Sequence, residues 1–239
     1  MMKTRFILLI LIGVINTSCI FLKGKSKSVN DFTTYTWMKG QIFTNAHINK
    51  EGKPNPESKD YYFRYYGVNY YIKFSECNFE GDISNFNNNF VQVLGEIKNG
   101  PWENENKKNK GRSGDYVVFS DIKTIERPVK IIYTDGNNNN HILISSKLQY
   151  DPVMIIESSS GIYCGGSEKE ANISPETFFE IYVRLIDICE TGKYHSENRI
   201  MGSSQIQIEY IDKKEVFILV DNKELQDARE YIHSFFEKH

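Results

Sequence analysis

Residues 90–97 read Phe-Val-Gln-Val-Leu-Gly-Glu-Ile and end at Asn99-Gly100-Pro101. Val91, Val93 and Ile97 fall on one face of an extended chain, because successive side chains of a strand point to opposite sides. Gly95 lies inside the run, where a glycine indicates a bulge or the close approach of another backbone. The pattern therefore predicts a half-buried strand with an irregularity at Gly95.

Further strands are predicted on both sides of this one. Thr34–Phe43 is rich in strand-forming residues, and Tyr61–Phe74 predicts two strands joined across Gly67-Val68-Asn69. Asn49–Asp60 reads as a loop from its glycine, prolines and charges. A long polar loop follows the Gly95 strand, and a closing strand is predicted over Tyr116–Ile125.

This order of strands resembles a small five-stranded barrel of the OB type. The resemblance covers residues 34–127 and rests on the pattern of strands and loops, with the glycine-bearing strand and a short polar connection before it. It implies an N-terminal OB-like β module. Arg127-Pro128 is the expected boundary, because proline interrupts a ladder and disfavours a helix before it.

Residues 128–239 predict an α+β module. Hairpins are expected over Val129–Leu148, with a loose solvated tip at Asp135–Asn140, and over Ser203–Val220. Ser174-Pro175-Glu176 predicts a helix start, with serine as the N-cap and proline at the first helical position. A second amphipathic helix is expected from Asn222. The predicted fold class is thus mostly β, an OB-like barrel followed by an α+β module with two amphipathic helices.

The first nineteen residues predict export. Lys3 and Arg5 precede an apolar run over Phe6–Ile15, which is too short to cross a bilayer as a helix. Asn16-Thr17-Ser18-Cys19 then resembles the lipobox of bacterial lipoproteins, although Asn16 stands where that signal usually has leucine. The resemblance implies that residues 1–18 are a cleaved signal peptide and that Cys19 is acylated, for example with palmitate. Residues 19–33 would be a flexible tether to the membrane.

The composition narrows the choice of partners. The chain has 239 residues, is 40% hydrophobic and 13% aromatic, and carries a net charge of −2. These values are typical of a folded protein, and they provide no global positive field for nucleic acid, so no nucleic-acid partner is expected. The basic cluster Lys107–Arg112 is interpreted as a solvated loop. No metal or cofactor is expected: Asp135 begins a calcium-like string, but Asn140 and Ser146 occupy the positions where a calcium loop needs glycine and glutamate.

Cys164 is the candidate for chemistry, since a thiol in a loop rich in glycine and serine can act as a nucleophile if a histidine supplies the base. His141 and His195 are the candidate bases. The alternative is a structural thiol, either buried or bridged to Cys189 in a disulfide, with Cys77 left over. The surroundings of Cys164 match no cysteine-peptidase signature.

The sequence therefore predicts a lipoprotein anchored through Cys19 in the bacterial cell membrane or outer membrane, facing the periplasm or the exterior. We expect a non-catalytic role in binding an envelope protein or ligand, or in envelope scaffolding. One alternative is a cysteine hydrolase that uses Cys164 with His141 or His195. The other is a secreted inhibitor or immunity-type protein, which would present one large exposed patch.

Overall fold

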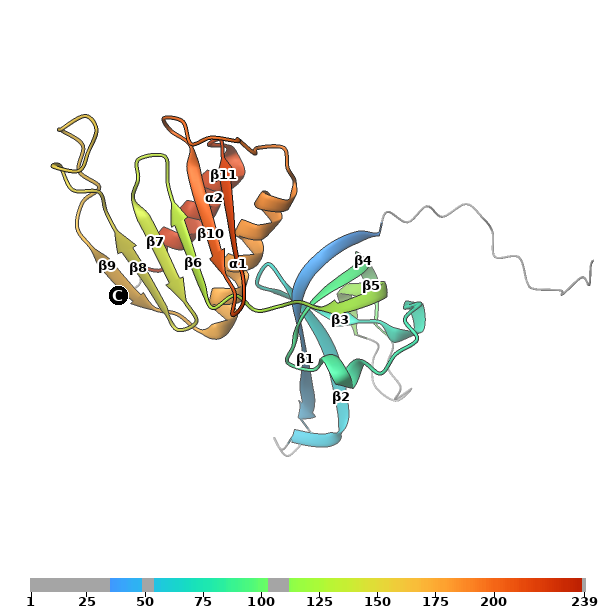
Figure 1. Cartoon of the computed structure of the whole chain (residues 1–239). Helices are drawn as coiled ribbons and strands as arrows, with labels where there is room; N and C mark the ends of the chain where they lie inside the picture. The colour runs from blue at the N-terminus through green and yellow to red at the C-terminus, as the bar shows by residue number, and fades with distance from the viewer. Residues whose placement is uncertain (1–34, 49–53, 103–111, 238–239) are drawn as a thin grey trace, which may run out of the picture. The chain divides into compact units, whose positions relative to one another are not determined.

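The computed structural model describes residues 35–48, 54–102 and 112–237, and residues 34–239 belong to one compact unit. The described residues form two β-sheets, and both helices belong to the part of the chain that forms the second sheet (Figure 1). The first sheet is a closed barrel of five strands, β1 (Thr36–Ile48), β2 (Pro54–Tyr65), β3 (Val68–Ile72), β4 (Phe90–Pro101) and β5 (Ser113–Thr124).

The barrel has OB-type connectivity. Its strands follow the order β1-β2-β3-β5-β4, and β4 pairs with β1 to close the ring. All pairs are antiparallel except β3 with β5, which run parallel. Two short 3-10 turns, η1 (Phe74–Glu76) and η2 (Ile83–Phe86), lie between β3 and β4. The OB-like prediction for the first module is confirmed.

Every second side chain of a strand points inward, and these side chains fill the barrel. Val91 and Val93 of β4 are fully buried with Ile42, Phe63 and residues of the other strands. The pairing of β4 with β5 shifts register between Leu94 and Gly95, which is the irregularity that Gly95 predicts. A side chain at Gly95 would overlap the carbonyl oxygen of Val118, so the glycine allows β5 to approach closely.

The second sheet has six antiparallel strands in the order β11-β10-β6-β7-β8-β9. The strands β6 to β9 form a meander, and β10 returns to lie between β6 and β11 (Figure 1). Their bounds are β6 (Lys130–Thr134), β7 (Asn140–Ile144), β8 (Lys147–Asp151), β9 (Lys169–Asn172), β10 (Ser204–Glu209) and β11 (Lys214–Leu219).

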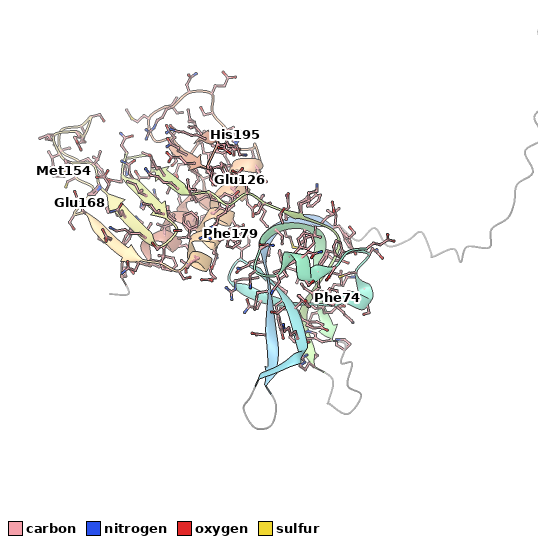
Figure 2. All side chains as sticks on the ribbon, turned by 60° about the horizontal axis from the view of Figure 1, so that its bottom comes forward. Phe74, Glu126, Met154, Glu168, Phe179 and His195 are labelled. Atoms are coloured by element: carbon pink, nitrogen blue, oxygen red, sulfur yellow. The ribbon has the colours of Figure 1, made fainter. Side chains whose placement is uncertain are left out.

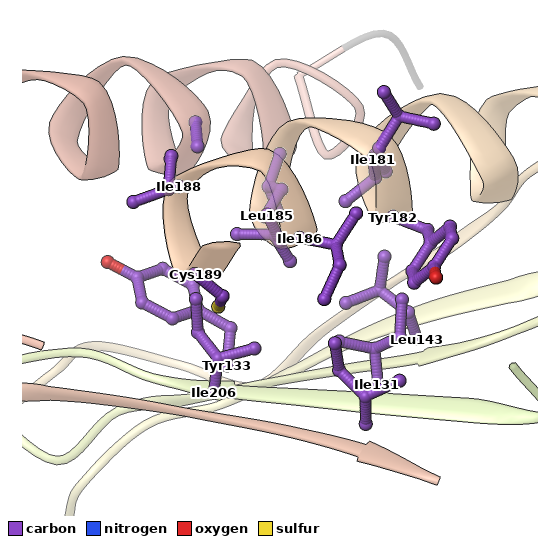
Figure 3. Close-up of a cluster of buried hydrophobic side chains, with 14 of the residues drawn as sticks. Ile131, Tyr133, Leu143, Ile181, Tyr182, Leu185, Ile186, Ile188, Cys189 and Ile206 are labelled. Carbon is purple, nitrogen blue, oxygen red and sulfur yellow. The ribbon is translucent and has the colours of Figure 1, made fainter. Parts of the chain in front are cut away.

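Two helices cover one face of this sheet, as Figure 1 shows. Helix α1 (Pro175–Glu190) has Ser174 as its N-cap, as the sequence predicts, and the Ser174 side chain accepts a hydrogen bond from the Thr177 N–H. Helix α2 (Lys223–His233) has Asn222 as its N-cap. Figure 3 shows the core under α1, where Tyr182, Ile186 and Cys189 point toward the strands of the sheet.

Two local predictions were wrong. Pro54–Asp60 belongs to strand β2, because this segment pairs with the end of β1 in a long hairpin. The turn between β6 and β7 is not a loose solvated tip. Asp135 and Asn139 are 4% and 2% exposed, and the Asp135 carboxylate accepts bonds from the backbone N–H groups of Asn137 and Asn139. These bonds offset the cost of burying a carboxylate.

Candidate ligand-binding face

A row of four aromatic residues crosses the outer surface of the barrel. Phe43 lies opposite Tyr62, Tyr62 opposite Tyr71, and Tyr71 opposite Tyr116, so the row crosses β1, β2, β3 and β5. Residues that are directly opposite in neighbouring strands share a face of the sheet. In each strand, a residue next to the aromatic one points into the barrel, so the aromatic residue itself lies on the outer surface of the barrel.

Trp102 packs on the middle of this row. Its ring stacks on Tyr71 with centroids 4.7 Å apart and an angle of 12°, and it meets the edge of Tyr62 at 6.2 Å. Phe43 and Tyr62 stack at 5.7 Å. We call Phe43, Tyr62, Tyr71, Trp102 and Tyr116 the barrel face. Within the barrel face, Tyr71 and Tyr116 are buried, whereas Phe43, Tyr62 and Trp102 are half-buried.

Three cations lie over these rings. Arg64 stands 4.8 Å from the centre of Phe43, Arg112 is 5.2 Å from Trp102, and Lys73 is 4.7 Å from Tyr116. Cations at such distances are attracted to the negative face of an aromatic ring. The barrel face therefore combines flat apolar surfaces with donors of hydrogen bonds.

Carboxylates partly balance these cations. Arg112 pairs with Asp60 at 2.5 Å, and Lys73 pairs with Glu76 at 2.8 Å. Burial and the nearby Asp60 charge raise the pKa of Tyr62, so its hydroxyl keeps the proton that it donates to Asp60 at 3.4 Å. The hydrogen bond from Lys73 is the main reason that the pKa of Glu76 is lowered. Asp60 and Arg112 thus form an acceptor and a donor side by side.

A second polar cluster joins strand β1 to helix α1. Lys39 is 6% exposed, and its ammonium group lies 3.0 Å from Asp187 and 2.5 Å from Glu190. Burial disfavours the charge of Lys39, but the bonds to Glu190 and Asp187 outweigh burial and raise its pKa. A small open hollow lies beside Lys39, and its lining includes Gln41, Arg64 and Phe179 but none of Cys164, His141 and His195.

The structure does not assemble the hydrolase constellation. Cys164 lies exposed in the loop after β8, and its Sγ faces the carbonyl oxygen of Gly166 at 3.8 Å. His141 is fully buried in β7, with one ring nitrogen 3.4 Å from the Tyr133 carbonyl oxygen and the other 2.8 Å from His233. Both nitrogens of His141 are therefore engaged away from the thiol.

His195 lies near the opposite edge of the same sheet. It forms a bridge with Leu219 of β11, and its Nε2 contacts the Cys189 carbonyl oxygen at 2.5 Å. Figure 2 shows His195 far from Met154 and Glu168, which flank the Cys164 loop at the β9 edge. Four strands lie between the edge strands β11 and β9, and neighbouring strands are about 4.8 Å apart.

The possible disulfide between Cys164 and Cys189 is not formed, because both are free thiols. Cys189 is fully buried on the inner face of α1, as its place in the helix pattern predicts, and burial raises its pKa. Cys164 is exposed on a loop, so the prediction that it would be buried or bridged was wrong. Cys77 is also free, and burial raises its pKa to about 11.

Several sequence predictions lie outside the described residues. They include Cys19, the signal segment and tether, and Lys107–Gly111 of the basic cluster. Arg112, the last member of that cluster, is described and lies on the barrel face. Over the described ranges, no three His, Cys, Asp or Glu side chains gather in a way that could hold a metal ion. None of the helices found in those ranges has the length and apolar character needed to span a membrane.

Comparisons with known protein families, with curated proteins and with solved structures find no match to this chain.

Sequence reasoning missed the barrel face, although a signal was present. Tyr61, Tyr62 and Phe63 are consecutive, and Tyr70 and Tyr71 are adjacent. Since neighbouring residues of a strand point to opposite faces, aromatic residues in both positions must place some rings outside the barrel. The register that aligns these outer rings in one row depends on strand pairing, which the pattern alone does not specify.

Proposed function

We propose that this chain is a lipid-anchored binding protein of the bacterial envelope, attached through Cys19, and that its barrel face binds an oligosaccharide. The aromatic row with its attached Asp60–Arg112 pair is the observation that supports this function. OB-type barrels bind oligonucleotides and oligosaccharides on the face built from strands 2 and 3. Tyr62 and Tyr71 lie on those two strands here.

The chemistry of the face suits a sugar. A pyranose ring has apolar C–H groups on its faces and hydroxyl groups around its edge. Phe43, Tyr62 and Trp102 offer half-buried rings against which such faces can pack. Asp60 can accept a hydrogen bond from a hydroxyl group while Arg112 donates one, so the pair matches both roles of the hydroxyl.

The charge balance favours a neutral ligand over nucleic acid. Nucleic-acid sites gain most of their affinity from cations that neutralise phosphates. Here Asp60 and Glu76 each pair with a cation of the face, and the remaining Arg64 donates to the Asn69 side chain at 3.0 Å. A lipid anchor at Cys19 would hold the face near envelope polysaccharides.

The test is binding of the full-length chain in detergent to an array of oligosaccharides, followed by titration calorimetry of the best binder. Tyr62→Ala is expected to weaken binding about tenfold, because one stacking ring is lost. A single-stranded oligonucleotide serves as the competing probe, and its binding should be negligible at 0.15 M salt.

Trp37→Ala is the matched control. Trp37 is an exposed aromatic residue of β1 with Lys123 4.3 Å above its ring, but it lies outside the row. Its removal should leave the affinity unchanged. Absence of binding to every oligosaccharide, or equal losses for Trp37→Ala and Tyr62→Ala, would contradict the proposed function. If the chain binds the oligonucleotide in a salt-dependent way and Tyr62→Ala abolishes that binding, the ligand of the barrel face is nucleic acid and not a sugar.

A further inference from the structure

The last turn of α2 meets the sheet through a pair of histidines. His233 of α2 and His141 of β7 face each other with their Nε2 atoms 2.8 Å apart, and the two rings cross at 74°. His141 is fully buried, whereas His233 is half-buried. Tyr150 of β8 packs against both rings, with centroids at 5.1 and 5.2 Å.

The hydrogen-bond partners define where the protons lie. Nδ1 of His141 stands 3.4 Å from the backbone carbonyl oxygen of Tyr133, which can only accept, so this nitrogen carries a proton. In the neutral ring Nε2 of His141 is then an acceptor, and Nε2 of His233 donates to it. If both rings became charged, two N–H groups would face each other across the same 2.8 Å and the bond would be lost.

The surrounding groups favour the neutral pair. Burial, followed by the nearby His233, lowers the pKa of His141 to about 4. Burial, Lys169 of β9 and Arg229 of α2 lower the pKa of His233. Asp135 after β6 acts on both rings in the opposite direction, as Glu237 does on His233, without reversing either shift. Arg229 also lowers the pKa of His141. Tyr133 and Tyr150 pack against the pair, and burial raises their pKa values, so both stay neutral in acid.

The pair also connects to the loop after β8. The Tyr150 hydroxyl donates to the Gly165 carbonyl oxygen at 2.7 Å, and Asn139 donates to the Tyr163 hydroxyl at 2.9 Å. Helix α2 otherwise buries only three of its residues, whereas α1 buries nine. The histidine contact therefore adds a polar contact to the apolar packing of Ile232 at the end of α2.

We propose that His141 and His233 form a proton-controlled latch. In the neutral state the pair holds the C-terminal turn of α2 on the sheet and supports, through Tyr150, the loop after β8. In an acidic medium both rings take up protons, the bond between them is lost, and the turn of α2 leaves the sheet. This inference does not depend on the proposed barrel-face ligand.

The direction of the pH effect follows from proton binding. A released His141 has an ordinary pKa of 6.5 and takes up a proton more readily than the packed ring, whose pKa is about 4. The packed state is therefore fully favoured above pH 6.5, loses stability as the pH falls, and stops losing it below about pH 4. Between pH 7 and pH 5 the released population should rise on the order of twentyfold.

The test is amide hydrogen exchange of the full-length chain in detergent, measured by mass spectrometry at pH 7 and pH 5. Rates are divided by those of an unstructured peptide at the same pH, which gives protection factors. Peptides from residues 223–233 should lose protection on the order of twentyfold between the two pH values. Peptides from α1 in the same sample should change several-fold less.

His233→Gln is the decisive variant. Its half-buried site tolerates the change, and the glutamine oxygen can accept from a protonated His141, so the acid loss in α2 should shrink to a few-fold. His195→Gln, a histidine outside the pair, should keep the wild-type response. Equal protection of wild-type α2 at pH 7 and pH 5, or an undiminished acid loss in His233→Gln, would overturn the latch.

Discussion

Gly95 shows how a single position supports the barrel. The strand pairing shifts at this residue, and an added Cβ atom would overlap the Val118 carbonyl oxygen and press on Phe119. Gly95→Ala should therefore lower the free energy of unfolding by about 1–3 kcal/mol, as overpacking of a close contact does. Urea denaturation followed by circular dichroism measures this change.

Gly100→Ala is the control in the same strand. A Cβ atom at Gly100 would meet only the Tyr116 ring, at an ordinary contact distance of 3.5 Å. The substitution should change the free energy of unfolding by less than about 0.5 kcal/mol, the usual range for surface changes. Equal losses at positions 95 and 100 would show that the loss reflects glycine removal in general and not the approach of β5.

Among the elements, α1 depends most clearly on a local signal. The Ser174 hydroxyl accepts the Thr177 N–H at 3.1 Å, and Pro175 occupies the first turn. Ser174→Ala should cost about 1 kcal/mol of stability, because a backbone donor at the helix end loses its partner. Ser174→Asp, which keeps an acceptor at the cap, should be nearly neutral. A full loss in the aspartate variant would mean that the cap bond is not the cause.

Elements with local signals could be predicted, and elements that depend on distant partners could not. The N-caps at Ser174 and Asn222 and the irregularity at Gly95 are all encoded within a few neighbouring residues. Strand β9 was missed, because Lys169–Asn172 has neither alternation nor β propensity and is extended only through its pairing with β8. The pairing of His141 with His233 joins residues 92 positions apart, so no sequence spacing indicates it.

For the whole molecule, attachment to the membrane is the central prediction. If Cys19 carries the lipid, Cys19→Ala should move the protein from the membrane pellet to a soluble or uncleaved-precursor fraction. Metabolic labelling with a clickable fatty acid should mark the wild-type chain and leave the variant unlabelled. An unlabelled wild-type chain would rule out the anchor, and Cys77→Ala, at a thiol in the folded part, is the control that should stay labelled.

The two-module division at Arg127-Pro128 stays a prediction at this scale. The barrel strands end at Thr124 and the second sheet begins at Lys130, so among the described residues no strand from one side of Pro128 pairs with a strand from the other. Yet Lys39 of β1 is bonded to Asp187 and Glu190 of α1. Phe90 of β4 also stacks on Phe179 of α1 with ring centroids 3.7 Å apart, so the barrel and the second core are in direct contact.

The position of β10 has a consequence for synthesis. This strand lies between β6 and β11, but it is made after β6, β7, β8, β9 and α1. A chain that leaves the ribosome or crosses a membrane from its N-terminus can pair the β6–β9 meander as each turn emerges. The flank of β6 stays open until Ser204–Glu209 arrives, and during that interval it can pair with a strand of a neighbouring nascent chain. Synthesis of this protein thus has a late interval in which a holding chaperone is most useful.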